Sequence, residues 1–163
     1  MDNLKKDDIA EIVQDSVSEV LEKMMFMDIV HIGEAEPDNA PGSFNICGEI
    51  KFSGEVNGFL RLCCNKVFAY EATSSMLGED EEQIKEKKAR DTICEVLNMV
   101  IGNILYRIDR DRSIAELEIP HIVEVNQDKS DQPPMNFFYE FSSSEDESKD
   151  VLMFRLGIDC YET

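Results

Sequence analysis

Apolar positions near the start of the chain recur every three or four residues over 7 to about 28, which is the spacing of an amphipathic helix. Turn-forming residues dominate 37–43, and strict alternation over 44–52 then predicts a half-buried strand. A turn at Ser53-Gly54-Glu55 leads into a second strand over 56–64. The two strands are expected to pair as a hairpin.

Two helices are predicted after the hairpin. Asn65 is suited to cap a short helix that Gly78 ends, because Asn accepts a hydrogen bond from the first turn and Gly adopts a left-handed conformation at low cost. A charged run follows, and renewed helical spacing predicts a long helix over about 80–109. Beyond Pro120, alternation predicts three more strands. These strands lie at 121–126, 137–141 and 151–161, with polar loops at 127–134 and 142–150.

This order of elements, a helix, a hairpin, two helices and three strands, favours an α/β (α+β) fold. Long helices would pack on one mainly antiparallel sheet in a two-layer sandwich. A chain of 163 residues with 42% hydrophobic content can bury one sizeable core. We therefore expect a single domain that spans 1–163.

The composition narrows the possible partners. The formal net charge of −19, from 35 acidic and 16 basic residues, would repel a nucleic-acid backbone or an anionic membrane, so neither is expected to bind. No apolar run approaches the ~20 residues of a membrane-spanning helix, and the N-terminus lacks the order of a signal peptide. A cytoplasmic location is expected.

Cysteine and histidine do not suggest a metal site. The five cysteines are odd in number and lie in apolar segments, which predicts reduced core residues. Adjacent Cys63 and Cys64 would point to opposite faces of a strand, and His31 and His121 stand alone. The methionine-rich segment 24–27 is expected to fill gaps in the core. The cysteines are Cys47, Cys63, Cys64, Cys94 and Cys160.

One stripe of the long helix is polar. At about 100° of turn per residue, Asp91, Glu95, Asn98 and Gly102 fall on the same side, and Asp109 continues the line. Glu95 and Asn98 are expected to face solvent, where by themselves they would be ordinary surface residues. Gly102 costs ~1 kcal/mol relative to alanine inside a helix, and the close approach of another molecule explains it. The opposite side is expected to face the core through Ile93, Leu97, Val100, Ile101, Ile104 and Ile108.

The stripe has a partial copy near the N-terminus. Residues 15–22 align with 91–98, with identical Asp, Glu, Val and Leu. The alignment predicts a pseudo-two-fold internal repeat, in which each half gives a helix to one face of a shared sheet. The first copy carries Glu22 and Phe26 in place of the amide and the glycine, so only the second copy could form a site.

Asp91, Glu95, Asn98 and Gly102, followed by Pro120, resemble the motif of the CheC/CheX/FliY family, whose members remove phosphate from CheY-type receiver domains. The element order and the internal repeat resemble this family along most of the chain. A single intact active helix makes the sequence most similar to CheX, because CheC has two. The resemblance implies chemotaxis or a related two-component circuit, a homodimer, and a phosphorylated CheY-like receiver as the partner.

The side chains of the stripe indicate how such a reaction would work. An Asn carboxamide cannot act as a general base, but its carbonyl and NH₂ groups can hold a water in line with a phosphorus atom. By resemblance, Asn98 would orient this water in the receiver's active site and Glu95 would pair with the receiver's lysine. Asp91 and Gly102 would contact the partner. The receiver would supply the aspartyl phosphate and Mg²⁺, so no cofactor of the chain's own is expected.

A second interpretation is a module without catalysis, either a receiver-binding module or a scaffold of the same fold. The net charge of −19 supports it, because that charge does not favour docking onto the acidic pocket of a receiver. Glu95 and Asn98 favour the phosphatase. An assay of receiver dephosphorylation separates the two interpretations.

Overall fold

The computed structural model describes residues 4–34, 44–109, 115–125, 135–142, 149–159 and 161–162. Its first helix, α1, covers Lys6–Ser18, and the chain continues directly into a π-helical segment, η1, at Glu19–Met24. Ile9, Val13 and Val17 are buried and form the apolar face that the spacing predicts. The first predicted helix is confirmed, but its last turns are π-helical and it ends before residue 25.

Both ends of the second helix, α2 at Lys66–Leu77, are set by the residues that the sequence indicates. The Asn65 side chain accepts a hydrogen bond of 2.9 Å from the backbone N–H of Phe68, which satisfies one of the free donors of the first turn. Gly78 ends the helix at a φ of 65°, a conformation that a side chain would strain. Both predictions are confirmed.

The long helix, α3, covers Glu86–Ile108 and begins later than predicted. A 3-10 turn, η3 at Glu81–Gln83, precedes it, and Ile84 is buried in an extended conformation between the two. The charged run before Ile84 has no apolar face, and helices gain most of their stability from packing such a face. The predicted core face of α3 is confirmed. Ile93, Leu97, Val100, Ile101 and Ile104 are fully buried, and Ile108 is half-buried.

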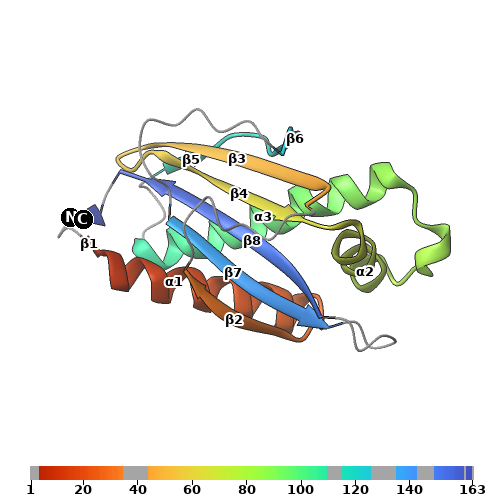
Figure 1. Cartoon of the computed structure of the whole chain (residues 1–163). Coiled ribbons are helices and arrows are strands. Elements are labelled where there is room, and N and C mark those ends of the chain that lie inside the picture. Colours follow the sequence, from red (N-terminus) through yellow and green to blue (C-terminus); the bar gives the residue numbers. More distant parts are fainter. Residues whose placement is uncertain are drawn as a thin grey trace.

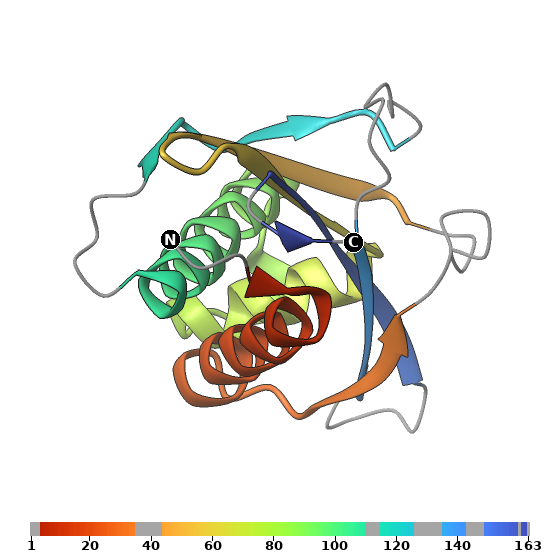
Figure 2. The ribbon, with the colours of Figure 1, turned by 90° about the vertical axis from the view of Figure 1, so that its left-hand side faces the viewer.

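A seven-stranded antiparallel sheet carries the three helices on one face. Its strands follow the order β2-β7-β8-β4-β3-β5, and β6 also pairs with β3. Figures 1 and 2 show that the sheet curves around α1, α2 and α3, which lie together on its concave side. The strands are β2 at Ile29–Glu34, β3 at Ile46–Gly54, β4 at Gly58–Cys64, β5 at Ala115–Leu117, β6 at His121–Val123, β7 at Met135–Ser142 and β8 at Lys149–Ile158. The prediction of one mainly antiparallel sheet with helices packed on it is confirmed.

The strands differ from the predicted ones mainly at the edges of the sheet. The β3–β4 hairpin is confirmed, with Ile46 opposite Cys64 and Phe52 opposite Gly58. β2 and β5 are additional, as is a small parallel sheet of β1 at Leu4–Lys5 with β9 at Tyr161–Glu162. The pairing of β2 with β7 shifts in register between His31 and Gly33. The predicted loops at 127–134 and 143–148 lie outside the described residues.

α3 packs closely on β3 because Gly48 has no side chain. A Cβ at Gly48 would lie 2.7 Å from Cδ1 of Leu97, which is too close for two carbon atoms. The contact holds the apolar side of α3 against the sheet. It therefore turns the polar stripe of the helix away from the sheet.

The prediction of reduced cysteines is wrong for one pair. Cys47 and Cys63 lie directly opposite each other in the β3–β4 register and form a disulfide on the face away from the helices. The hairpin brings them together, which the count of cysteines alone does not reveal. Cys64 points to the opposite face and is buried in the main core, where burial raises the pKa of its thiol. Cys160 lies outside the described residues.

Candidate functional site

The polar stripe of α3 lies on the surface. Asp91 and Glu95 are exposed, whereas Asn98 and Gly102 are half-buried. Among the described residues, the structure shows no hydrogen bond or ion pair for the side chains of Glu95 and Asn98. Both are therefore available to another molecule. Asp109, which the helical spacing adds to the stripe, lies just past the end of the helix in an extended conformation.

Gly102 faces open space. Apart from the adjoining stretch of its own helix, no heavy atom of the described residues would lie within 4 Å of a Cβ built at this position, so their packing does not require glycine here. Alanine would fit and would favour the helix by ~1 kcal/mol. An absent side chain at this point leaves room for a partner to approach the helix backbone.

Cys94 lies beside the stripe but is a poor nucleophile. Burial raises the pKa of its thiol, and the nearby carboxylate of Asp91 raises it further. With this raised pKa the side chain stays protonated at neutral pH. The thiolate is the reactive form of cysteine, so the protonated side chain reacts poorly. The polar groups that the stripe offers are the carboxylates of Asp91 and Glu95 and the carboxamide of Asn98.

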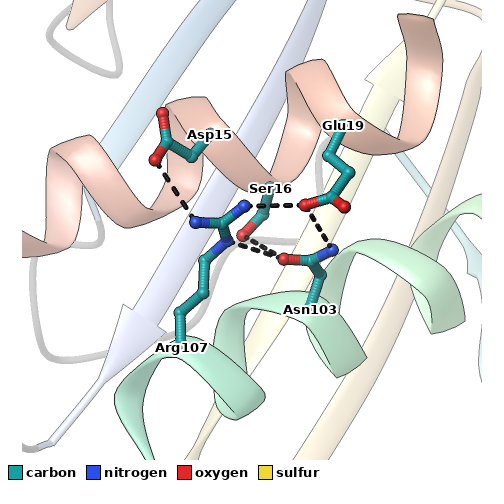
Figure 3. Close-up of polar contacts among 5 residues, drawn as sticks. All are labelled: Asp15, Ser16, Glu19, Asn103 and Arg107. Atoms are coloured by element: carbon teal, nitrogen blue, oxygen red, sulfur yellow. Dashed lines mark hydrogen bonds and ion pairs between the residues drawn. The ribbon is translucent and has the colours of Figure 1, made fainter. Parts of the chain in front are cut away.

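The corresponding acidic residues, Asp15 of α1 and Glu19 of η1, are engaged within the chain (Figure 3). Arg107 of α3 donates from Nη2 to Glu19 Oε2 at 2.7 Å and from Nη1 to Asp15 Oδ2 at 3.3 Å. Its Nε donates to Oδ1 of Asn103 at 2.7 Å, and Asn103 Nδ2 donates to Glu19 Oε2 at 3.2 Å. Ser16 Oγ also donates to Asn103 Oδ1, at 3.3 Å. We call these five residues the α1–α3 clamp.

The clamp changes the titration of Glu19. Hydrogen bonds from Asn103 and Arg107 stabilise its carboxylate and lower its pKa below the ordinary value of 4.5. Sequence patterning alone does not single out Asn103 or Arg107, because their partners on α1 lie 84 to 92 residues away. Their spacing of four residues on α3, which places both on one side of that helix, is the available signal.

The second half of the N-terminal copy departs from the alignment. Glu22 lies in η1, where the wider π-helical turn shifts the helical phase. Phe26 lies beyond the helix end, has a φ of 56° and is 84% exposed. Phe26 therefore does not occupy the helical position that matches Gly102, and the expectation of a bulky ring at that place is wrong.

An apolar cavity of about 470 Å³ opens beside Gly102. Residues of η1, α3 and β5 line it, and they include Val20, Met24, Met99, Gly102, Tyr106 and Leu117. The prediction that the methionine-rich segment fills the core is correct for Met25 and Met27, which are buried. It is wrong for Met24, which is 57% exposed at this cavity, and for Phe26.

The described residues contain no group of three or more His, Cys, Asp or Glu side chains that could hold a metal ion. Within the same part of the chain, no helix has the length and apolar content needed to cross a membrane.

A family model for the chemotaxis phosphatase CheX matches residues 46–140, which is more than half of the chain and includes the whole stripe. The chain belongs to the CheX family. A comparison with curated proteins finds no significant match. Solved structures with the same fold include the chemotaxis protein CheX of Vibrio vulnificus, with a TM-score of 0.75, 17% identity, and coverage of 93% of this chain and 99% of that one.

Two further structures extend the likeness of this CheX-family chain. A CheC-like superfamily protein of Shewanella has a TM-score of 0.68 and 20% identity, over 92% of this chain and 97% of that one. CheX of Borrelia burgdorferi, crystallised in a complex with CheY, BeF₃ and Mg²⁺, has a TM-score of 0.65 and 17% identity, over 93% of this chain and 97% of that one. These likenesses show the fold.

Proposed function

We propose that this CheX-family protein hydrolyses the aspartyl phosphate of a CheY-type response regulator, with Asn98 and Glu95 of α3 as the active pair. The observation that carries the proposal is the difference between the two helices. Glu95 and Asn98 lie on an accessible stripe and have no hydrogen bond or ion pair to another described side chain, whereas Glu19 of the other copy is held in the clamp. Family membership and the relative that was crystallised with CheY support the same partner.

The reaction needs a positioned water more than a base. Asn98 would enter the receiver's active site, and its carboxamide would hold a water in line with the phosphorus atom. The water oxygen forms a bond to phosphorus as the bond from phosphorus to the aspartyl oxygen breaks. The products are inorganic phosphate, which takes up the water's protons, and the free aspartate carboxylate. Asn98 accepts no proton in this reaction, because an amide has no useful pKa.

Glu95 has a docking role in this proposal. Its exposed carboxylate would pair with the lysine of the receiver's active site, which fixes the register of the two proteins. Asp91, one turn earlier, would contact the edge of the partner, and Gly102 would leave room for the partner's backbone. The receiver brings Mg²⁺ to neutralise the phosphoryl charge, so the chain needs no cofactor of its own.

We further propose that the chain is one domain, 1–163, built from two related halves. The order of the sheet supports this repeat, because each helix is followed along the chain by an edge strand, an inner strand and a central strand, which are β2, β3 and β4 after α1 and β5, β7 and β8 after α3. Exchanging β2 with β5, β7 with β3 and β8 with β4 reproduces the same order. The exchange also relates α1 to α3.

We propose a homodimer that forms at the free edge of β2. This strand ends the sheet, and its neighbourhood exposes Phe26, Val30 and Ile32, which are apolar. Light scattering at micromolar concentration should give the mass of two chains for wild type and of one chain for Val30→Glu. The same charge at an exposed valine of α2, in Val67→Glu, should leave the dimer intact. A wild-type monomer would contradict the proposal.

A receiver-binding or scaffold module without catalysis is the alternative, and the net charge of −19 favours it. The test follows the loss of aspartyl phosphate from the cognate phosphorylated receiver with Mg²⁺, with and without the protein. Wild type should accelerate the loss and Asn98→Ala should not. Binding of the receiver by wild type without any acceleration would favour the alternative.

A further inference from the structure

The apolar cavity beside Gly102 is continuous with the proposed active stripe. Gly102 belongs to both, and Met99, which lines the cavity, follows Asn98 directly in α3. The far wall comes from Met24 of η1 and Leu117 of β5, both partly exposed. A partner docked on Asn98 and Gly102 would therefore lie next to this cavity.

The size and lining of the cavity suit a single bulky apolar group. Its volume of about 470 Å³ is large enough to admit a bulky apolar side chain. Met24 and Met99 are unbranched and flexible, so they can adapt to side chains of different shapes. The described residues leave the cavity open at Gly102, because apart from the adjoining stretch of helix none of their atoms lies within 4 Å of a Cβ built there.

Acidic residues lie near the apolar cavity. A second cavity shares Asn103 and Tyr106 with it and is lined by acidic residues of α1 and η1, with Arg107 as a cation among its described lining residues. Asp91 and Glu95 are exposed on the same stripe of α3 as Gly102. A partner that buries an apolar group here gains from basic groups around that group. The acidic lining residues are Asp8, Glu11, Asp15 and Glu19.

We infer that this cavity receives one bulky apolar side chain of the phosphorylated receiver, flanked on the receiver by lysine or arginine. The inference rests on the proposed function, because it concerns the same partner at the same helix. Central apolar side chains that fill a pocket carry much of the energy of a protein interface. Such an anchor fixes the distance and angle at which Asn98 meets the phosphate.

The experiment measures the affinity of the protein for the cognate receiver activated with BeF₃ and Mg²⁺. Gly102→Leu should fill the cavity from α3, and Met24→Ala should remove part of its far wall without altering the stripe. Each should raise the Kd about 10-fold, a magnitude typical of a buried apolar contact. The control is Leu77→Ala on α2, which removes an apolar side chain that is 48% exposed, similar to Met24, and should leave the Kd unchanged.

The outcomes separate this inference from the proposed function. Affinities equal to wild type in both Gly102→Leu and Met24→Ala would overturn the docking cavity, even if wild type dephosphorylates the receiver. Weakened binding in both variants, with no dephosphorylation by wild type, would support the cavity and overturn the phosphatase. Thermal unfolding of each variant verifies that it folds, and the open space at Gly102 favours this. No binding of the activated receiver by wild type would overturn both.

Discussion

The two helices that carry the repeated Asp and Glu use the same residues in opposite ways. Near the N-terminus, Asp15 of α1 and Glu19 of η1 are held by Arg107 and join this helical segment to α3. On α3, Asp91 and Glu95 are exposed, and Glu95 has no hydrogen bond or ion pair to another described residue. The difference teaches that the availability of a side chain, rather than its identity, separates a site from a structural contact.

The two helices also differ in the path of the backbone. α3 stays α-helical through Ile108, so its stripe keeps one phase from Asp91 to Gly102. The N-terminal copy turns π-helical at Glu19, and Phe26 already lies beyond the helix. A regular helix thus lines up an amide and an open glycine on one side, and the irregular helix does not.

The largest expected effect is the loss of turnover in Asn98→Ala. Removing one positioned hydrogen-bonding group costs about 100-fold or more in rate where positioning carries the catalysis. We expect kcat to fall by about this factor, while KM for the receiver changes little. The matched control on the other helix, Glu22→Ala, removes an exposed side chain and should retain wild-type kcat. Equal kcat values in both variants would contradict the role of Asn98.

The second-largest effect is expected for Glu95→Ala, which should weaken binding of the receiver. Losing one partner of a charge-assisted pair weakens association, and we expect the KM to rise about 10-fold. Because the pair lies at a charged interface, the difference between wild type and Glu95→Ala should shrink as salt is added. A KM unchanged at low salt would remove the docking role from Glu95.

Arg107→Ala should lower the free energy of unfolding, because it removes the hydrogen bonds of the guanidinium to Asp15, Glu19 and Asn103. These groups are partly exposed and screened by solvent, so we expect a loss of about 1 kcal/mol in urea denaturation. Arg90→Ala breaks a single exposed pair with Glu86 on α3 and should lose less stability than Arg107→Ala does. Similar losses in the two variants would show that the clamp does not act as a network.

A smaller effect concerns pH. Because the folded state lowers the pKa of Glu19 below 4.5, its carboxylate contributes stability that is fully present above that pH. The contribution is lost as pH falls through the lower folded pKa. The stability difference between wild type and Glu19→Gln should therefore be constant near neutrality and shrink in acid. A difference that grows as the pH falls would contradict the clamp.

The smallest expected effect is in Glu22→Asn combined with Phe26→Gly. This double variant gives the N-terminal copy the asparagine and the glycine of the active copy. We expect no gain in turnover per chain when Asn98→Ala is also present. Glu19 stays engaged with Arg107, and the π-helical turn keeps position 22 out of phase. Recovered activity would show that sequence alone made the first copy inactive.

Much of the fold follows from local patterns. Asn65 and Gly78 mark the ends of α2, the alternation of β3 and β4 gives the hairpin, and the apolar side of α3 fixes which residues turn outward. Each of these signals acts over a few residues, so it can be read from the sequence. The stripe with Glu95 and Asn98 is predictable for the same reason.

The features that could not be predicted depend on distant contacts or on the backbone. The clamp joins α1 to Arg107, and the cavity joins η1 to β5, so neither is visible in a local pattern. The aligned residues of the repeat predict an α-helical phase, which the π-helical turn of η1 breaks. The Cys47–Cys63 disulfide lies between the features that local patterns predict and those that they do not. The hairpin is predicted, and its register places the two cysteines opposite each other.

The most direct test of a single site on α3 is the NMR spectrum of the isotope-labelled protein as the cognate receiver, activated with BeF₃ and Mg²⁺, is added. We predict that the side-chain NH₂ signal of Asn98 shifts together with backbone amides of 91–102, while those of 15–26 change little. Inactive receiver should cause much smaller shifts. Shifts centred on 15–26, with Asn98 unchanged, would contradict the account.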